Sequence, residues 1–358
     1  MTEVLIVGAS FAGLVAAREL RGRDVLVVDR SPIGAHQTSA CALPVTLAEW
    51  LGAREAILHA DHRLRLRVGR DTWRVDLPEP FCTVDYEACC RLIAKQCDFR
   101  FERIRVTGRD ADGALGSAGE HLTANHLVDA SGWRRVLDPA GPTLGGNGRL
   151  VTGVEDHVPT AAAPATPGFD FIFDRDVVRA GYAWSFPSGD HARVGVGSFE
   201  REPLNPAMDA LHERERMGAG SERHGGAICC VPRDPVLDGV LFVGDAAGHA
   251  LPLTLEGIRP AAYFGCAAGR LLRAVLEGAL PGDEAHARYA ALHTSHLGGY
   301  RRLLRAQRWT RRTPDALKRR AVRRWLGPGV NAADPTARPF RQLRYLDVLR
   351  AERLPALP

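Results

Sequence analysis

The N-terminal segment, residues 3–30, constrains the fold more than any other part of this 358-residue chain. Val4 to Val7 is an uninterrupted apolar run, which is typical of a parallel strand buried on both faces. The glycine-rich sequence "GASFAG" (residues 8–13) follows, then an apolar helical pattern from Leu14 to Leu20 and a second buried strand that ends at Asp29. This order of elements predicts a βαβ unit.

The residue types in this unit fit a dinucleotide. Gly8 allows the tight turn from strand to helix, and Gly13 lets the helix pack close to the sheet. The helix N-terminus then directs free N–H groups toward a pyrophosphate, and the Asp29 carboxylate accepts from a ribose hydroxyl. Ser10 replaces the middle glycine of G-x-G-x-x-G; its side chain narrows the backbone approach, while its hydroxyl can bond to phosphate. The alternative is a βαβ turn that needs glycine for geometry alone. The predicted dinucleotide-binding residues of this unit are Gly8, Ser10, Phe11, Ala12, Gly13, Asp29 and Arg30.

Two later strands also end in an acidic residue. "HLVDASG" ends at Asp129, and "GVLFVGD" ends at Gly244 and Asp245. A loop containing Pro252 follows the second strand, and a long helix begins near Gly257 and Ile258. An NAD domain does not need this additional acidic strand end, whereas an FAD domain does, because the flavin half extends beyond the adenosine.

In this interpretation Asp245 binds a ribityl hydroxyl, and the helix directs its positive end at the pyrimidine side of the isoalloxazine. The candidate FAD ligands from these two segments are therefore Asp129, Gly244, Asp245, Pro252, Gly257 and Ile258. The alternatives are a helix N-cap for Asp245 and a turn residue for Asp129.

Three segments, "GASFAG", "DASGWRR" and "GDAAGHALPLTLEGIR", resemble the signatures of a flavoprotein superfamily. It includes p-hydroxybenzoate hydroxylase-type monooxygenases and geranylgeranyl reductases. The sequence "GYAWSFPSGDHARVGVGSF" (residues 181–199) is similar to the reductase motif YxWxFP followed by GxG, and "SACALP" (39–44) resembles a cysteine-containing loop beside the flavin. Leu255 stands where the family usually has glycine.

The resemblance implies an α/β fold with an α+β insertion. It comprises a Rossmann-like FAD-binding domain of the glutathione reductase type, a mainly antiparallel β substrate domain and a C-terminal helical segment. Alternation in residues 62–77, with a turn at Gly69 to Asp71, independently predicts a hairpin of the substrate domain. The expected boundaries are 1–60, 78–140 and 232–285 for the FAD-binding domain, 61–77 and 141–231 for the substrate domain, and 286–358 for the C-terminal helical region.

Four residues are catalytic candidates. Tyr182, Trp184 and Phe186 alternate, so a strand places them on one face, where they either form core or wall a cavity for a flat or elongated apolar molecule. The resemblance favours the cavity. Cys41, the matching position of the loop, is a proton donor to a substrate carbon, a residue that shapes the pocket, or a small buried hydrophobe.

The remaining composition narrows location and partners. The eight cysteines form no C-x-x-C pair, so we expect reduced thiols, no metal site and a cytoplasmic protein. No secretory leader is recognised at the N-terminus. Residues 298–325 hold eleven Lys or Arg against one acid; a basic amphipathic helix there either contacts a membrane peripherally or presents a solvated outer face. No nucleic-acid-binding module is recognised.

These features predict an FAD-dependent oxidoreductase. The favoured reaction is reduction of a C=C bond in an isoprenoid-like or other apolar substrate by hydride from flavin N5. Electrons come from NADPH that docks transiently or from a separate electron-donor reductase, because no second glycine-rich βαβ unit is present. The alternatives are a monooxygenase acting on an apolar or aromatic metabolite, a redox-neutral flavin-dependent cyclase or isomerase, and a non-catalytic flavin- or lipid-binding protein.

Overall fold

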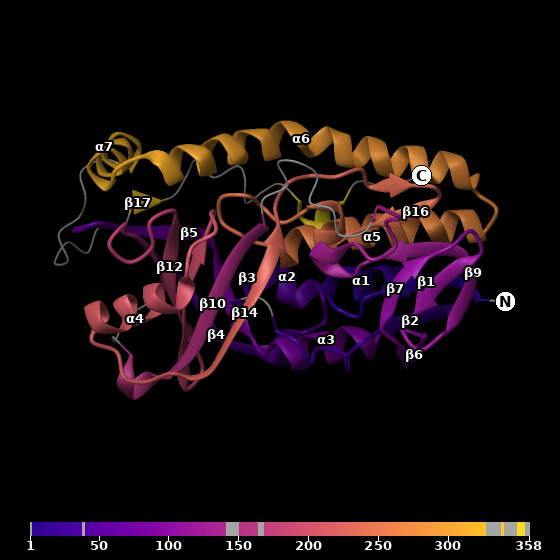
Figure 1. The fold of residues 1–358 in the computed structure, drawn as a ribbon, viewed down its shortest axis with the longest axis horizontal. Helices are drawn as coiled ribbons and strands as arrows, with labels where there is room; N and C mark the ends of the chain where they lie inside the picture. The colour runs from indigo at the N-terminus through magenta and orange to yellow at the C-terminus, as the bar shows by residue number, and fades with distance from the viewer. Residues whose placement is uncertain are drawn as a thin grey trace.

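The computed structural model describes residues 2–37, 40–140, 150–163, 168–326, 338–339 and 349–354. It contains two sheets with helices packed around them, and a long C-terminal helix that runs beside both (Figure 1). Ser39 of the predicted cysteine loop, and residues 327–337, 340–348 and 355–358 of the predicted C-terminal helical region, lie outside the described residues. The fold is the predicted α/β class with a β-rich second part.

The first sheet is the Rossmann-like one. Its main path has the order β15-β16-β9-β1-β2-β6, and every neighbouring pair from β16 to β6 is parallel. Within the described chain its strands are β1 (Thr2–Val7), β2 (Val25–Asp29), β6 (Arg100–Arg103), β7 (Val106–Arg109), β8 (Gly113–Gly116), β9 (His121–Asp129), β15 (Val236–Leu237) and β16 (Val240–Phe242). The three carboxyl ends of β1, β9 and β16 therefore lie side by side, which is where an open α/β sheet binds its ligand.

Two helices cover one face of this sheet and pack closely against each other. They are α1 (Phe11–Glu19) and α5 (Ile258–Leu276). A methyl group added at Gly265 would stand 2.4 Å from the Ala12 carbonyl oxygen, and one at Gly269 would stand 2.6 Å from that of Ala16. The small residues of α5 thus bring its N-terminus close to the glycine-rich turn.

The second sheet has the order β14-β10-β13-β12-β11-β4-β5-β17, with β3 paired to β5, and is mainly antiparallel. The hairpin expected at Gly69 forms, with Val68 opposite Asp71. Counted over the described residues, its strands are β3 (Ala42–Pro44), β4 (Ile57–Val68), β5 (Asp71–Val84), β10 (Leu150–Pro159), β11 (Phe169–Phe173), β12 (Gly181–Ser188), β13 (His191–Ser198), β14 (Ser221–Cys229) and β17 (Arg338–Pro339).

The two faces of the second sheet are covered differently. Ala183, Val194 and Val196 pack toward α4 (Leu204–Glu215), whereas Tyr182 and its aromatic neighbours point to the opposite face. The remaining helices are α2 (Val45–Trp50), α3 (Tyr86–Ala94), α6 (Gly282–Arg312) and α7 (Asp315–Leu326).

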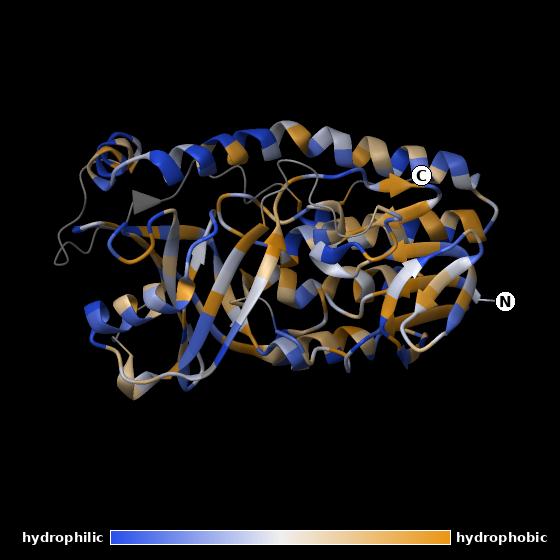
Figure 2. Cartoon of the chain, in the orientation of Figure 1, coloured by the Kyte–Doolittle hydropathy of each residue, from blue (hydrophilic) through white to orange (hydrophobic). Residues whose placement is uncertain are grey.

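Figure 2 shows mostly apolar residues along β1, and many polar ones near the α7 end of α6. Among the helices that the structure describes, none combines the length and the apolar character that a membrane span requires.

Candidate active site

A cavity of about 1090 Å³ lies between the two sheets and is lined from both. This volume is slightly above the ~300–1,000 Å³ typical of small-molecule and cofactor sites. One end is formed by the β1–α1 turn, the end of β2 and the loop after β9. The other is formed by apolar side chains of the second sheet.

The β1–α1 turn has no room for side chains at its two glycines. Gly8 has φ +114°, and a methyl group there would lie 2.3 Å from the Ala130 carbonyl oxygen. One at Gly13 would lie 2.0 Å from the Gly8 carbonyl oxygen, so Gly13 serves helix packing and does not line the cavity. Ser10 does line it, together with Phe11 and Ala12, but its hydroxyl shares a 2.7 Å hydrogen bond with the Tyr86 hydroxyl.

Asp29 lies at the end of β2 on the cavity wall. Its Oδ2 accepts a 2.9 Å hydrogen bond from the Ala9 N–H, and its Oδ1 accepts one of 3.0 Å from the Ser31 N–H. Two backbone donors therefore fix the carboxylate, and each oxygen keeps a second lone pair for a ribose hydroxyl.

Three arginines make the end of the cavity near the β1–α1 turn positively charged. Arg30, Arg105 and Arg134 all line it. Burial lowers the pKa of Arg134, and the charges of Arg30 and Arg105 lower it further. Arg105 was not predicted, because it lies outside every motif. The cluster suits a phosphate-bearing ligand.

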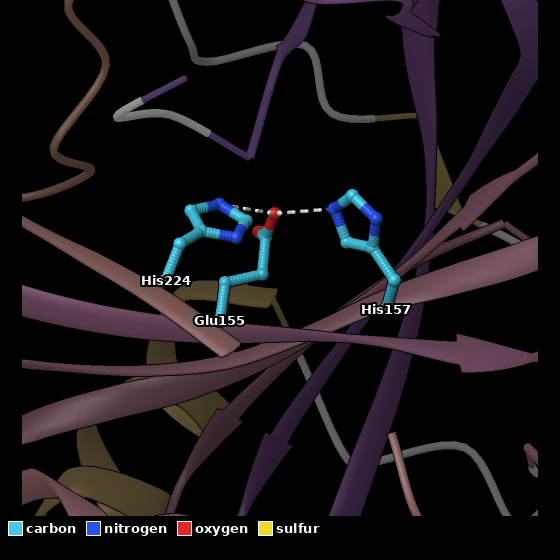
Figure 3. Close-up of side chains that lie close together, drawn as sticks. All are labelled: Glu155, His157 and His224. Atoms are coloured by element: carbon cyan, nitrogen blue, oxygen red, sulfur yellow. Dashed lines mark ion pairs between the residues drawn. The ribbon is translucent and has the colours of Figure 1, made fainter. Parts of the chain in front are cut away.

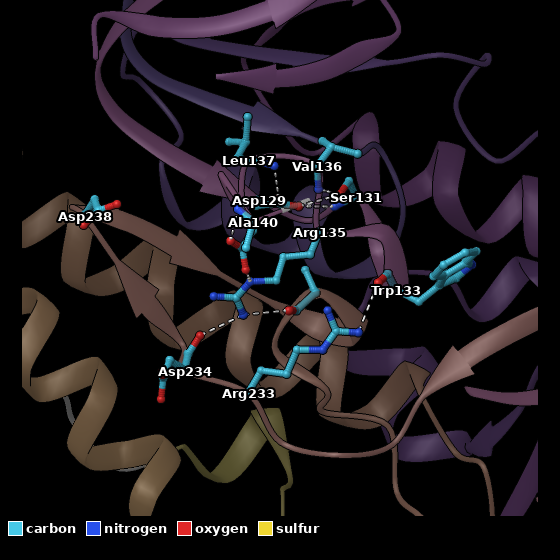
Figure 4. A network of polar contacts seen from close by, with 12 residues as sticks. Asp129, Ser131, Trp133, Arg135, Val136, Leu137, Ala140, Arg233, Asp234 and Asp238 are labelled. Carbon is cyan, nitrogen blue, oxygen red and sulfur yellow. Dashed lines mark hydrogen bonds and ion pairs between the residues drawn. The ribbon is translucent and has the colours of Figure 1, made fainter. Parts of the chain in front are cut away.

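Asp129 does not line the cavity, so its predicted contact with the cofactor is corrected. It is fully buried and accepts from the Ser131 N–H (2.9 Å), the Ser131 hydroxyl (2.6 Å) and the Leu137 N–H (2.7 Å), as Figure 4 shows. Asp129 is therefore a turn residue, which is the alternative interpretation of its position in the sequence. What lines the cavity here is the loop that Asp129 organises, from Ala130 to Arg134.

Two further arginines join that loop to the end of β16. The Arg135 guanidinium donates to the carbonyls of Asp234 (2.9 Å) and Ala246 (3.1 Å), and Arg233 donates to the Trp133 carbonyl at 3.1 Å (Figure 4). The segments "DASGWRR" and "GDAAG" are thus held together as one edge of the cavity.

Asp245 lies on the cavity wall with Gly244, as do Gly257 and Ile258 at the N-terminus of α5. Burial raises the pKa of Asp245 to about 7, and the charge of Arg233 only partly opposes this. Pro252 does not line the cavity. Its carbonyl instead accepts a 2.6 Å hydrogen bond from Gln307 of α6, so that predicted contact is also corrected.

Leu255 lines the cavity in a left-handed backbone conformation, φ +58°. A glycine adopts this conformation without strain, which explains physically why the family usually has one here.

The predicted aromatic row lies on the cavity wall. Tyr182, Trp184 and Phe186 line it from β12, with Phe169, Phe171 and Phe173 of β11 beside them. The Tyr182 hydroxyl donates to the Thr254 carbonyl at 2.6 Å. The Trp184 indole N–H donates to Glu155 Oε2 at 2.9 Å.

The glycines of the motif make space for the Trp184 indole. Gly195 lies opposite Trp184 in the β12–β13 register, and a methyl group there would stand 2.2 Å from the indole Cζ2. Methyl groups at Gly197 and Gly153 would stand 3.4 and 3.5 Å from the same ring. The glycines of the GxG pattern thus leave a flat surface on which the Trp184 indole lies.

The structure does not bring Cys41 to the cavity. Ala40 and Ala42 line it, while the Cys41 side chain is fully buried in the core, and its backbone has φ +55°. Burial raises the pKa of this thiol to about 12, which the nearby Arg193 opposes. The expected role as a proton donor is therefore not supported by its position.

Sequence reasoning missed a polar cluster next to Trp184. Glu155 lies on β10 between His157 of β10 and His224 of β14 (Figure 3). Its Oε1 is 3.5 Å from His224 Nε2, 3.7 Å from His157 Nε2 and 3.9 Å from Arg193 Nη1. Burial alone would raise the pKa of Glu155, but these partners and Trp184 lower it. Alternating sequence places Glu155 and His157 on one face, yet only the β10–β14 register adds His224.

The residues present fit FAD. Gly8 without room for a side chain, a positively charged end, two helix N-termini and the carboxylates of Asp29 and Asp245 surround one cavity of about 1090 Å³. The apolar part against the second sheet leaves space for a substrate.

No family model matches the chain, but curated proteins named as reductases are similar to it. Digeranylgeranylglycerophospholipid reductase 1 of Methanothermobacter thermautotrophicus is 29% identical, over 85% of this chain and 82% of the relative. The enzyme of the same name from Methanopyrus kandleri is 29% identical, over 77% and 81%.

Solved structures share the fold. A geranylgeranyl bacteriochlorophyll reductase-like protein from Thermoplasma acidophilum has a TM-score of 0.77 at 19% identity, covering 88% of this chain and 89% of that one. A probable FAD-dependent monooxygenase from Pseudomonas aeruginosa has a TM-score of 0.64 at 18% identity, covering 87% and 97%.

The fold, the cavity and these relatives define an FAD-dependent oxidoreductase. Within that class the chain is similar to digeranylgeranylglycerophospholipid reductases, at 29% identity over about four fifths of their length.

Proposed function

We propose that this protein reduces a C=C bond of an isoprenoid-like lipid. The observation that carries this proposal is the aromatic and aliphatic wall that the second sheet turns toward the cofactor end of the cavity. It combines the aromatic residues of β11 and β12 with Leu64, Leu66 and Leu77 of the β4–β5 hairpin. Reduced FAD supplies a hydride when bound.

The chain's own residues have separable tasks in this reaction. Asp29 and the arginine cluster hold the adenosine and phosphate end, and Asp245 with the α5 N-terminus positions the ring end. The aromatic wall binds the polyprenyl chain, excludes water and orients the double bond. The names of the curated relatives, reductases of a digeranylgeranyl glycerophospholipid, support this substrate class.

The electron donor completes the proposal. The described chain has one glycine-rich βαβ unit, β1–α1–β2, and the cavity it forms is assigned to FAD. We therefore expect NADPH to dock only transiently, or a separate reductase to deliver electrons.

An anaerobic single-turnover experiment tests the reaction. Enzyme reduced by dithionite is mixed with a geranylgeranyl lipid, and flavin absorbance and product mass are followed. Recovery of oxidised flavin with a product two hydrogens heavier is expected. Turnover that requires O₂ would make the protein a monooxygenase. A product of unchanged mass that needs reduced flavin would make it a cyclase or isomerase.

We further propose that the end of α6 and α7 contact an anionic membrane, from which a lipid substrate enters. Trp309, Leu317 and Trp325 are 47%, 55% and 50% exposed among arginines, and Trp325 also lines the cavity. A basic surface with exposed aromatic residues is typical of peripheral membrane binding. The exposed basic residues here are Arg301, Arg302, Arg305, Arg308, Arg312, Arg320, Arg323 and Arg324.

Vesicle co-sedimentation tests this second proposal. The protein should sediment with phosphatidylglycerol vesicles and not with phosphatidylcholine vesicles. Changing Arg301, Arg305 and Arg308 to Glu should abolish sedimentation. The same changes at exposed Arg21, Arg100 and Arg103, which lie beside or in the first sheet, should not abolish it. Equal loss in both variants would show that net charge, and not this surface, drives binding.

A further inference from the structure

Reduction of a C=C bond consumes a proton as well as a hydride, so the following inference rests on the proposed function. Cys41 is turned away from the cavity, and another acid is required. The Tyr182 hydroxyl already donates to Thr254. Among the described residues that the second sheet contributes to the cavity wall, His224 is the one imidazole. His36, from the loop after β2, also lines the cavity but is exposed.

His224 is connected to the aromatic wall of the cavity through Glu155. Its Nε2 lies 3.5 Å from Glu155 Oε1, and the other oxygen of Glu155 accepts from Trp184 at 2.9 Å. Glu155 and His224 are opposite each other in the β10–β14 register. The Gln37 amide lies 3.2 Å from Glu155 and 3.5 Å from His224, and covers the pair from the loop after β2. The imidazole is therefore held on the wall beside Trp184, where an alkene lies in the proposed reaction.

The charges around Glu155 favour a proton on the imidazole. The side chain of Glu155 is only 4% exposed, and its surroundings keep it ionised. A buried carboxylate next to an imidazole stabilises the imidazolium. The groups that face this carboxylate are Arg193 of β13, Trp184 of β12, His157 of β10, His224 of β14 and Gln37 of the loop.

A second imidazole leads from this carboxylate toward the surface. His157 lies 3.7 Å from Glu155 Oε1, and its ring stacks on that of His191 with 4.7 Å between centroids. His191 Nδ1 bonds at 2.9 Å to Asp190, whose side chain is fully exposed at the β12–β13 turn. The β10–β14 register shifts between Glu155 and His157, an irregularity often found beside functional sites.

We propose that His224 is the catalytic acid that protonates the substrate carbon, that Glu155 positions it, and that His157 returns the proton. The π bond of the alkene breaks and two C–H bonds form. One hydrogen arrives as hydride with the electron pair from reduced flavin, and the other as the proton of the His224 N–H bond. Neutral His224 then regains a proton through Glu155 from His157, which exchanges with solvent near His191.

A metal ion is the competing occupant, because the ligand atoms of Glu155, His157 and His224 all lie within 4.8 Å of one another. The Glu155 carboxylate already has three partners with positive charge or polarised N–H groups: Trp184, Gln37 and Arg193. A cation placed among the ligands would compete with these donors, so the arrangement favours a proton.

The experiment compares His224→Asn and His224→Gln with His212→Asn as the matched control. His212 also pairs with a carboxylate of β10, Asp156, at 3.2 Å, but it belongs to α4 on the opposite face of the sheet. Single-turnover reoxidation of reduced enzyme by substrate should slow about 10²- to 10⁴-fold in both His224 variants and not in the control. Reoxidation by O₂ should be unchanged in all three.

A second measurement does not depend on turnover. In ¹⁵N-histidine NMR of the flavin-loaded protein, Glu155→Gln should lower the pKa of the His224 imidazole and leave that of His212 unchanged. A purely structural role for Glu155 would not move it selectively. An unchanged His224 titration would overturn the inference even if the wild type proves to reduce another substrate.

The remaining outcomes separate the two proposals. If the His224 variants lose less than tenfold while the wild type reduces the lipid, the acid is not His224 and the proposed function stands. Stoichiometric Zn²⁺ binding that His224→Asn abolishes, together with turnover that requires the metal, would replace the acid with a metal site.

Discussion

Replacing Gly195 by alanine tests whether the motif glycines exist to accommodate Trp184. The new methyl group would stand 2.2 and 2.4 Å from two indole carbons and 2.7 Å from the Val154 carbonyl oxygen. Favourable carbon–carbon contacts are roughly 3.5–4.0 Å, so the indole must move by about an ångström or more. Overpacking of this kind costs about 1–3 kcal/mol. Displacing the indole also removes its hydrogen bond to the Glu155 carboxylate, worth roughly 1.5–3 kcal/mol.

Gly153→Ala is the matched control. Its methyl group would lie 3.5 Å from the edge of the same indole and 3.5 Å from the Val196 carbonyl oxygen, both ordinary contacts. We expect Gly195→Ala to lower the free energy of unfolding by roughly 2.5–6 kcal/mol in urea titrations followed by circular dichroism, and to slow substrate turnover. Gly153→Ala should stay within about 1 kcal/mol of the wild type. Equal stability of the two variants would refute the explanation that glycine at position 195 is needed to make room for the Trp184 indole.

Three further predictions follow from single carboxylates and one thiol. Asp29→Ala should weaken FAD binding to the apoprotein by about 10- to 100-fold, roughly 1.5–3 kcal/mol, in a fluorescence titration, and unchanged affinity would exclude a ribose contact. The pKa of Asp245 is raised from 3.8 to about 7, so between these values the folded apoprotein binds more protons than the unfolded chain and its stability falls as pH rises. Asp245→Asn should remove that part of the pH dependence in unfolding titrations, and identical profiles would show that Asp245 is not perturbed. Cys41→Ser should slow anaerobic reoxidation by substrate less than tenfold, because the thiol faces the core; a loss of 10²-fold or more would restore its predicted role as an acid.

The parts of the fold that sequence predicted are those whose determinants are local. Val4 to Val7, the glycine-rich turn and Asp29 each depend on neighbours within one βαβ unit, and the structure has them as expected. The alternation of Tyr182, Trp184 and Phe186 likewise needs only the two-residue period of a strand.

Predictions failed where the same local pattern has two structural solutions. Asp129 ends β9 and Asp245 lies in the short 3-10 turn after β16, yet Asp129 turns inward to three donors of its own loop and Asp245 faces the cavity. The difference is set by the chain after the strand. Ser131 and Leu137 return to Asp129, whereas the loop after Asp245 continues toward α5. The prediction that the Cys41 thiol lies at the cavity failed for a similar reason. The loop reaches the cavity, but a left-handed backbone at Cys41 turns its side chain to the core.

The most specific motif of the sequence joins the two halves of the site. A tryptophan can lie flat on a sheet only where the strands beneath it leave room, which here requires Gly195 of β13, while a methyl group at Gly153 of β10 would lie at ordinary contact distance from the indole edge. Lying there, its N–H reaches a carboxylate two residues further along β10, Glu155, which would otherwise be a buried charge with one donor fewer. That carboxylate in turn holds His224 across the next strand pair. The pattern of aromatic residues and glycines therefore specifies more than an apolar wall, because the same geometry that flattens the indole also places an ionised group and an imidazole beside it.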